Sequence, residues 1–417
     1  MQSSLQEEST INIKNAIVNI ILVVSTLVWY LCIFSFLKGN SGFTGKYLVL
    51  LFGINLLAVV FFAVLSTVLI QKIEKRLKFI TYWMIAGIFV SSLALLVGGS
   101  SFFYVAIISG VVGAYFGFGF PVVLGYYSAN IKSVYRARIS GLTIFFNGVG
   151  FALTGVFISN STVVYVASAL ILWKLCGLLV ILLLKPSEVL VNKEETVSYK
   201  SILKMRSMLF YFLPWLMFSL VNNFAFPVLY SAFPVDLVNN MTTVEAVIAG
   251  VSAIFFGFFA DRFGRKRLLF FGFVLLGLGY ALLGLFPHYD RGLLFYTVAD
   301  GVAWGIFFTL FLLTLWGDIA DKRGSEKFFV IGFLPYLLSN FLQLLFGSYV
   351  ATSVVELSAV FSFACFFLFI AAVPLYLAPE TLSEKELRAI DLQDYLDKAT
   401  AKAEKEAEKA HLKEKTD

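Results

Sequence analysis

Two ionisable side chains lie deep inside apolar stretches of the sequence, where no capping motif accounts for them. Asp300 stands in TVADGVAWG and Lys174 in ILWKLCG. A charged group near the centre of a bilayer costs about 2.5–3.5 kcal/mol on insertion scales, so each such residue requires a function or a buried partner. A carboxyl group there can carry a proton or bind a cation, and an ammonium group can bind an anion. The structural alternatives are a polar contact for Asp300, an interhelical partner or a partly neutral form for Lys174, and a Lys174–Asp300 pair.

The residues that intramembrane enzymes need are missing from the apolar stretches. The two histidines, His288 and His411, stand in a loop and in the C-terminal tail, and the three cysteines are scattered through apolar runs. Asp300 is the only deep aspartate, so an aspartate pair for proteolysis is also missing. Single cysteines in apolar surroundings behave as small hydrophobic residues rather than metal ligands. We therefore expect no enzyme activity, no metal site and no cofactor.

The elements that carry these residues are apolar runs of membrane length. The chain has 417 residues, of which 59% are hydrophobic and 14% are charged, against roughly 25% charged in soluble domains. Runs of 18 or more apolar residues can cross a hydrocarbon core of ~30 Å, and without strict alternation they must do so as helices. The sequence predicts an all-α integral membrane protein with twelve spans: 15–37, 46–70, 79–98, 102–128, 139–159, 162–184, 207–232, 243–260, 268–287, 292–317, 328–350 and 354–377.

The charges in the loops give the orientation of these spans. Most of the 32 Lys and Arg residues fall in alternate loops and in the tail. Because cytoplasmic loops carry the excess of Lys and Arg, both termini are expected in the cytoplasm, and we expect a plasma-membrane location. The net charge of +6 is then explained by topology and does not indicate nucleic-acid binding.

A polar stretch divides the chain into two halves. The sequence KPSEVLVNKEETVSYKSILKMR, residues 185–206, separates six predicted spans from six. This layout is typical of transporters built from two repeated halves. We expect a six-helix bundle over 1–184, a cytoplasmic central loop over 185–206, a second six-helix bundle over 207–378, and a polar helical tail over 379–417 that is mainly a solvated helix.

Four further acidic residues near the spans have a simple structural explanation. Thr242-x-x-Glu245 and Ser353-x-x-Glu356 fit capping boxes that would open spans eight and twelve. Asp318 and Asp321 stand near Lys322 and Arg323 at the cytoplasmic end of span ten. We expect the two glutamates to be structural and the two aspartates to belong to an ionic network.

The segment GFFADRFGRKR, which runs from Gly257 to Arg267, is the most specific motif in the chain. It resembles the G-x-x-x-D-R-x-G-R-[KR] signature of the major facilitator superfamily and stands where that signature is found, between the second and third spans of a half. Glycine permits close helix approach or a tight turn, and a carboxylate can cap a helix or pair with arginine. The resemblance implies a breakable gate that holds the outward-facing state, formed by Gly257, Asp261, Arg262, Gly264, Arg265 and Lys266.

Other segments agree less closely with the family pattern. In the first half Thr67, Gln71 and Glu74 replace the motif's Gly, Asp and Gly, so a gate there is expected to be weaker or differently built. The segment RARISG, 136–141, resembles the entry to the family's fifth span, and PETL, 379–382, resembles the ending of its sugar and metabolite porters. Span five lacks the Gly-Pro core of drug antiporters, which disfavours that class.

The resemblance also implies a solute site at the midplane between the halves. Span ten borders that cavity in the family, so Asp300 is the leading candidate for proton coupling or cation binding. Span six is peripheral, which makes Lys174 a weaker candidate for anion binding. Amides and aromatic residues in the spans complete the expected cavity: Trp29, Tyr30, Asn55, Asn147, Asn222, Asn223, Trp304, Asn340 and Gln343.

The function that these features predict is secondary transport by alternating access. We expect a monomer in the lipid bilayer that moves a small-molecule solute, a sugar or metabolite, with a proton or another ion. The alternatives are a non-transporting sensor or receptor on the same scaffold, an exporter of drugs or aromatic compounds, and a channel. A channel would leave the DRFGRKR loop unexplained, and the tail is too small and polar for a sensory domain.

Overall fold

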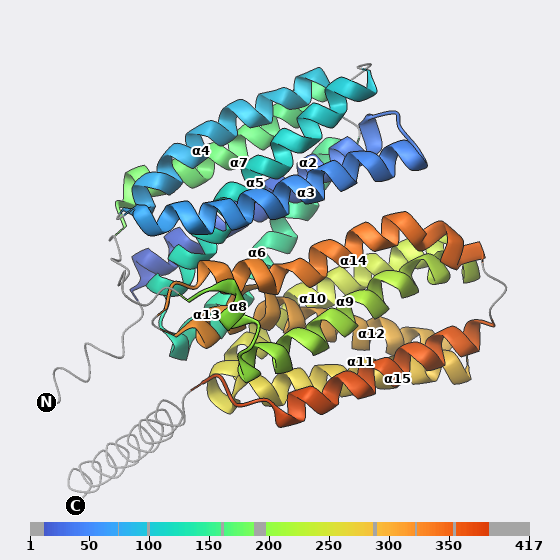
Figure 1. The fold of residues 1–417 in the computed structure, drawn as a ribbon. Helices are drawn as coiled ribbons and strands as arrows, with labels where there is room; N and C mark the ends of the chain where they lie inside the picture. The colour runs from blue at the N-terminus through green and yellow to red at the C-terminus, as the bar shows by residue number, and fades with distance from the viewer. Residues whose placement is uncertain are drawn as a thin grey trace, which may run out of the picture.

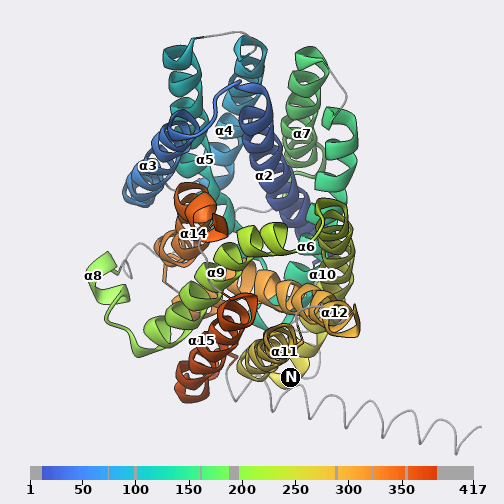
Figure 2. The same ribbon diagram turned by 90° about the vertical axis from the view of Figure 1, so that its right-hand side faces the viewer.

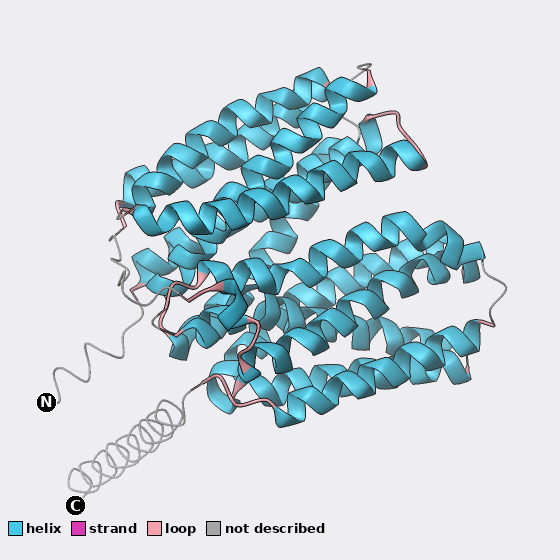
Figure 3. Ribbon diagram, viewed as in Figure 1, coloured by secondary structure: helices cyan, strands magenta, loops and turns pink. Residues whose placement is uncertain are grey.

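The structure is a computed structural model of the chain, and it describes residues 12–73, 75–97, 101–159, 162–186, 197–286, 290–321, 323–352 and 356–382. The regular elements of this part of the chain are helices joined by loops (Figure 3). It contains 12 helices that are long and apolar enough to cross a membrane, which confirms the all-α class and the number of spans. The predicted helical tail beyond residue 382 lies outside the described residues.

The helices form two bundles that follow the two halves of the sequence (Figure 1). The first contains α2 (Ile13–Asn40), α3 (Lys46–Leu69), α4 (Arg76–Ser92), α5 (Phe102–Asn130), α6 (Ser133–Ser159) and α7 (Val163–Leu184). The second contains α9 (Arg206–Ala232), α10 (Val235–Phe263), α11 (Arg265–Leu285), α12 (Asp290–Phe307), α13 (Leu315–Ala320), α14 (Glu326–Thr352) and α15 (Leu357–Leu377). A short helix, α8 (Tyr199–Ile202), lies in the segment between them.

The tenth span is not a continuous α-helix. A π-helical segment, Phe308–Thr314, joins α12 to α13, and the whole span runs from Asp290 to Ala320. The Thr314 hydroxyl donates to the carbonyl oxygen of Thr309, five residues earlier, at 2.7 Å. Wide turns of this kind are often found at functional sites.

The predicted capping boxes of spans eight and twelve are wrong. Span eight begins at Val235, directly after Pro234, because proline has a fixed φ that suits a helix start and lacks the N–H that would go unbonded there. Glu245 therefore lies inside α10, and the Thr242 hydroxyl donates to the carbonyl oxygen of Asn239 at 2.9 Å. Glu356 is the residue before α15 and makes no side-chain cap, while Ser353 lies outside the described residues.

The two bundles cross closely where α6 meets α10 (Figure 2). A Cβ atom at Gly257 would lie 2.6 Å from the carbonyl oxygen of Ala137, and one at Gly141 would lie 2.1 Å from that of Ala253. Both distances are too short for any side chain, so only glycine allows this approach. The motif glycine Gly257 thus brings the two bundles together at the end that the charge pattern places in the cytoplasm.

Candidate functional site

Asp261 is the centre of the polar contacts between the bundles. Its carboxylate is fully buried and accepts hydrogen bonds from the backbone N–H groups of Ala137 and Arg138 in α6, at 3.1 and 2.9 Å. It also pairs with the side chains of Arg138 and Arg265, both at 3.0 Å. One carboxylate therefore caps the neighbouring helix and binds two guanidinium groups, which are the two roles that the motif predicts.

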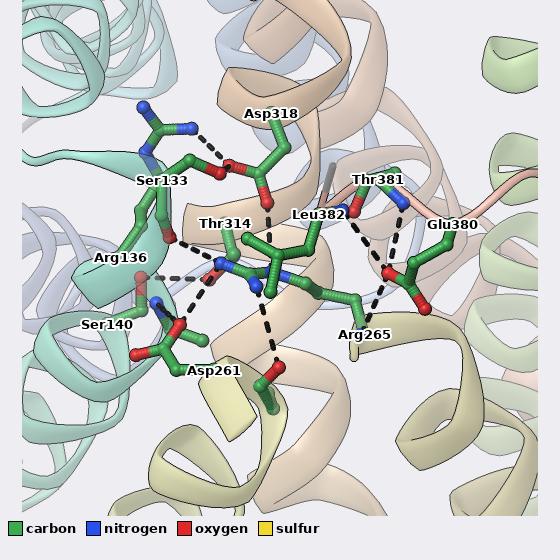
Figure 4. A network of polar contacts seen from close by, with 12 residues as sticks. Ser133, Arg136, Ser140, Asp261, Arg265, Thr314, Asp318, Glu380, Thr381 and Leu382 are labelled. Carbon is green, nitrogen blue, oxygen red and sulfur yellow. Dashed lines mark hydrogen bonds and ion pairs between the residues drawn. The ribbon is translucent and has the colours of Figure 1, made fainter. Parts of the chain in front are cut away.

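Asp318 is a second buried carboxylate in the same cluster (Figure 4). It pairs with Arg136 of the first bundle and with Nε of Arg265, the latter at 3.0 Å, and it accepts a hydrogen bond from the Ser133 hydroxyl at 2.9 Å. Asp318 was expected in an ionic network, but its partners are Arg136 and Arg265 rather than Arg323. Asp321 has no ion pair with any described residue, and Lys322 lies outside that part of the chain.

Glu380 of the PETL segment caps the start of α11, a role that the sequence did not indicate. Its carboxylate accepts hydrogen bonds from the backbone N–H groups of Arg265 and Lys266, at 3.0 and 3.2 Å. The residue before α11 is Gly264, whose φ of +93° is accessible to glycine and which has no side chain to form a cap. The end of span twelve therefore stabilises the helix that follows the gate motif.

Glu380→Ala should lower the stability of the folded protein by about 0.5–2 kcal/mol, the usual effect of losing an N-terminal helix cap. Glu380→Gln should lose less, because an amide oxygen can still accept these bonds. Thermal unfolding in detergent would measure both changes. Glu356→Ala is the matched control, since that exposed glutamate precedes α15 without a side-chain cap. Equal losses for the two alanine variants would contradict the capping role.

The first half forms its own contacts across the interface, in a different way from the second. Arg76 pairs with Glu326 at the start of α14, and the hydroxyls of Ser128 and Ser325 share a hydrogen bond. Thr67, which stands at the motif's glycine position, bonds with the Tyr199 hydroxyl of α8 at 2.7 Å. The contacts of this half across the interface thus come from Arg76, Glu326 and the segment between the bundles, while Glu74 lies outside the described residues.

Among the described residues, the ion pairs and hydrogen bonds that join the two bundles gather at one end of the molecule. They involve the ends of α5, α6, α10, α13 and α14, which face the side with the basic loops. The ribbons of the bundles diverge toward the opposite end (Figure 1). The structure is therefore closed on the side that the sequence places in the cytoplasm.

The remaining motif residues contribute less to this closure. Lys266 donates its backbone N–H to Glu380, and its ammonium group lies 5.6 Å from the ring centre of Tyr376. Arg262 is exposed at the end of α10. The energetic weight of the motif therefore rests on Asp261 and Arg265, which are both fully buried.

Asp300 is buried in the second bundle rather than open to a cavity. Asp300 is only 3% exposed. Its Oδ2 atom lies 3.4 Å from the Tyr296 hydroxyl, and its Oδ1 atom has no hydrogen-bond partner among the described residues. The Tyr296 hydroxyl also reaches that of Tyr280 at 3.4 Å, and Tyr280 donates to Asn222 Oδ1 at 2.9 Å. Two tyrosines thus connect the candidates Asp300 and Asn222 in one polar chain.

Glu245 is the acidic neighbour of Asp300, and sequence reasoning assigned it to a cap instead. The two carboxyl groups lie near enough to interact electrostatically. The small residue Gly301 makes this possible, because a Cβ there would lie 2.9 Å from the carbonyl oxygen of Glu245 and 2.8 Å from Cβ of Ile248. Asp300 has no ion pair with any described residue, so no cation there compensates its interaction with Glu245.

Lys174 lies in a closed aromatic cage within the first bundle and does not meet Asp300, so the considered pair is wrong. The residue is 0% exposed, and Nζ lies 4.3, 4.5 and 4.9 Å from the ring centres of Trp29, Trp83 and Tyr115. Nζ has no hydrogen-bond partner among the described residues. Desolvated cation–π contacts contribute up to about 2 kcal/mol each, so the rings themselves stabilise the charge.

This enclosure predicts that Lys174→Met keeps both the fold and transport. Replacing a buried charge by an apolar side chain of similar length is often neutral or stabilising, whereas Lys174→Ala should cost about 2–5 kcal/mol through the cavity that it leaves. Thermal unfolding and solute uptake in liposomes would be measured for both variants. A Lys174→Met protein that is as stable as wild type but fails to transport would show that the ammonium charge is functional.

The other cavity candidates separate into three groups. Trp29 is fully buried in the Lys174 cage and donates to Ser91 at 2.7 Å, so it does not line a cavity. Tyr30 donates to Asn55 Oδ1 at 2.7 Å, and both are buried within the first bundle. Six candidates stay partly accessible or at the edge of burial, on α6, α9, α12 and α14: Asn147, Asn222, Asn223, Trp304, Asn340 and Gln343.

Polar contacts connect part of this last group. Asn223 donates to the Ser339 hydroxyl at 3.0 Å, and Asn340 donates to the carbonyl oxygen of Tyr336 at 2.8 Å. The ring of Trp304 packs edge-on against that of Phe308, with centres 4.4 Å apart. The Asn223–Ser339 bond joins α9 to α14, and the ring centre of Trp304 in α12 lies 6.4 Å from that of Tyr336 in α14. Oδ1 of Asn147 in α6 has no hydrogen-bond partner among the described residues.

The comparison with known proteins agrees with this architecture. The sequence model described as Major Facilitator Superfamily matches residues 205–407, just under half of the chain. No curated protein matches the chain by sequence. Solved structures match over most of the chain at low identity, so they show the fold alone.

Three of these structures illustrate the range of the fold. The proton:xylose symporter XylE, bound to 6-bromo-6-deoxy-D-glucose, has a TM-score of 0.62 at 14% identity and covers 91% of this chain and 98% of its own. The human organic anion transporter MFSD10 (TETRAN) has a TM-score of 0.61 at 14% identity, covering 87% and 98%. A bacterial homologue of the iron transporter ferroportin, in an outward-facing state, has a TM-score of 0.66 at 9% identity, covering 88% and 98%. Residues 205–407 are thus similar to the major facilitator superfamily, and most of the chain is similar in fold to solved membrane transporters.

Proposed function

We propose that the protein moves a small organic solute across the membrane by alternating access, driven by a proton gradient. The observation that carries this proposal is the ionic cluster around Asp261, Arg265 and Asp318, which joins the two bundles at the end where the polar contacts of the described residues gather. Buried charges that pair across an interface can be separated when partners exchange, so such a cluster can act as a gate. Secondary transporters of this plan alternate by rocking one half against the other around a fixed site.

The coupling site that we propose is the carboxyl pair of Asp300 and Glu245. Two carboxylates without a cation are costly in the membrane interior, so the pair is expected to hold at least one proton. The tyrosine chain from Asp300 to Asn222 would connect that proton to the solute site. Release of the proton would then depend on the conformation of the second bundle, which contains both Asp300 and Glu245.

The candidates at the expected solute site favour an uncharged polar solute. Asn222, Asn223, Asn340 and Gln343 offer amide donors and acceptors, and Trp304 offers an aromatic face. This set suits a sugar or a similar metabolite, which is the class that the PETL segment also favours. The solved structures of the same fold are a proton:xylose symporter, an organic anion transporter and a homologue of an iron transporter, so the fold alone does not choose among substrates. We further propose that the protein acts as a monomer in the plasma membrane.

Reconstitution in liposomes with an internal pH dye would test this function. A panel of sugars, organic acids and amino acids would be added to liposomes with the wild-type protein and with Asp300→Asn. Solute-dependent acidification by the wild type alone is the expected result. Uptake without acidification in both proteins would mean a uniporter or another coupling ion. No uptake of any solute in the panel would favour a non-transporting sensor over a sugar or metabolite transporter.

A further inference from the structure

A cavity of about 200 Å³ lies between the two bundles and away from the proposed solute site. Its walls come from α3 and α5 of the first bundle, from α14 of the second, and from Tyr199 of α8. Apart from Tyr199, every lining residue is apolar; they include Val59, Ala63, Phe116, Phe120, Phe333 and Leu337. Figure 2 shows α14 beside α3, so the cavity lies at the edge where the two bundles meet.

The cavity opens toward the hydrocarbon of the bilayer. Val60 and Val64 of α3, and Val330 and Leu334 of α14, line it and are partly exposed on the outer surface. Both helices are membrane spans, so the solvent at this rim is lipid. An apolar cavity that offers no polar partners does not hold ordered water.

The contents of this cavity are therefore expected to be apolar and to come from the membrane. The cavity is smaller than the roughly 300–1,000 Å³ of ordinary ligand sites, which disfavours a whole solute. An empty space would leave the lining without dispersion contacts. An acyl chain gains little by leaving the bilayer for an apolar cavity, so a preference among lipids must come from the headgroup.

A cationic side chain, Lys327, lies beside Tyr199, which lines the cavity. The Tyr199 hydroxyl bonds with Thr67, and Nζ of Lys327 lies 5.7 Å from the centre of the Tyr199 ring. Nζ donates one hydrogen bond to the carbonyl oxygen of Val197 at 3.0 Å, and an ammonium group has two more donors to offer. Lys200, the neighbour of Tyr199, is exposed.

We propose that this cavity binds one anionic phospholipid of the cytoplasmic leaflet. The acyl chain enters between α3 and α14, and the phosphate group meets Lys327 beside Tyr199. Because the walls belong to both bundles, the lipid binds across the interface that is closed in this structure. The site is separate from Asp300 and does not depend on which solute is moved.

Native mass spectrometry of the full chain tests this site directly. The protein would be released from detergent micelles that contain equal amounts of phosphatidylglycerol and phosphatidylethanolamine. The wild type should retain one phosphatidylglycerol in preference to phosphatidylethanolamine. Lys327→Gln should reduce that preference about fivefold, which corresponds to about 1 kcal/mol for one cation near the headgroups. Lys327→Arg should keep it.

Two pocket-filling variants test the acyl-chain site. Val60→Phe should lose the retained lipid. Leu334→Phe, on the opposite wall of the cavity, makes the same test if Val60→Phe fails to fold. Val251→Phe is the matched control, because Val251 is 44% exposed on α10 and does not line the cavity. The proposal is overturned if the wild type retains no lipid or both lipids equally. It is also overturned if Lys327→Gln keeps the preference, or if Val251→Phe loses lipid to the same extent as the cavity variants.

Discussion

Asp261→Asn should open the cytoplasmic side of the protein. The asparagine keeps the shape of the side chain but leaves Arg265, which is fully buried, and Arg138 without their shared carboxylate. Removing one partner of a buried ion pair costs about 3–5 kcal/mol. Since each 1.4 kcal/mol is a factor of about ten, the population of the closed state should fall by on the order of a hundredfold or more.

Accessibility of a cysteine at Ser140 would measure this change. Ser140 is 0% exposed and bonds with Thr314 across the interface at 3.0 Å, so a cysteine there is shielded while the closure holds. In inside-out vesicles, with the three native cysteines replaced, a membrane-impermeant maleimide should label the Asp261→Asn protein much faster than the parent.

Asp321→Asn is the control for this experiment. It removes the same charge at an exposed cytoplasmic aspartate that has no ion pair with any described residue. Its φ of +52° is a conformation that asparagine tolerates. Equal labelling rates for Asp261→Asn and the parent would show that the carboxylate does not hold the two bundles together.

Asp300→Asn and Glu245→Gln should each abolish solute accumulation while leaving solute exchange intact. If the two carboxyl groups share the coupling proton, removing either one prevents proton binding and release without removing the solute site. We expect accumulation driven by a proton gradient to fall at least about tenfold, the effect of about 1.4 kcal/mol. Exchange of labelled solute outside the liposomes for unlabelled solute preloaded inside them should change little.

Glu356→Gln is the matched control for these two variants, since Glu356 is an exposed carboxyl at the start of α15. Loss of exchange together with accumulation would mean that the pair binds the solute itself, as a site for a cationic group would. Accumulation at the wild-type level in both variants would assign Asp300 and Glu245 a structural role.

The sequence could predict the features that depend on composition and local order. Long apolar runs and the alternation of basic loops require twelve helices, because a backbone in hydrocarbon must bond to itself. The motif could be located because Gly257, Asp261 and Gly264 stand at fixed spacing in a short segment of the sequence. The partners of Asp261 and Arg265 could not be predicted from it.

The misplaced residues are those whose environment depends on distant parts of the chain. Glu245 fits a capping box three residues after Thr242, yet the helix starts much earlier, after Pro234, and Glu245 lies inside it, near Asp300. No sequence pattern near Lys174 predicts its aromatic surroundings, because Trp29, Trp83 and Tyr115 come from three other helices. Glu380 meets Arg265 only after span twelve has returned to the cytoplasmic side.

The gate of the first half shows the same limit. Its motif positions are degenerate, which predicts a closure that is weaker or differently built. The structure places Arg76 against Glu326, a pair 250 residues apart in the numbering, and Thr67 against Tyr199 of the connecting segment. Such pairings are set by how the two bundles pack, and no local pattern contains that information.

Paired distance measurements between the bundles test the central claim of alternating access most directly. Spin labels would be placed at the exposed Lys75 and Arg267 on the cytoplasmic side, and at the exposed Lys46 and Asp236 on the opposite side. In lipid, the wild type should show a short cytoplasmic distance and a long outer distance. Asp261→Asn should reverse both, with a longer cytoplasmic distance and a shorter outer distance. A cytoplasmic distance that lengthens while the outer distance stays fixed would contradict the rocking of two bundles around a central site.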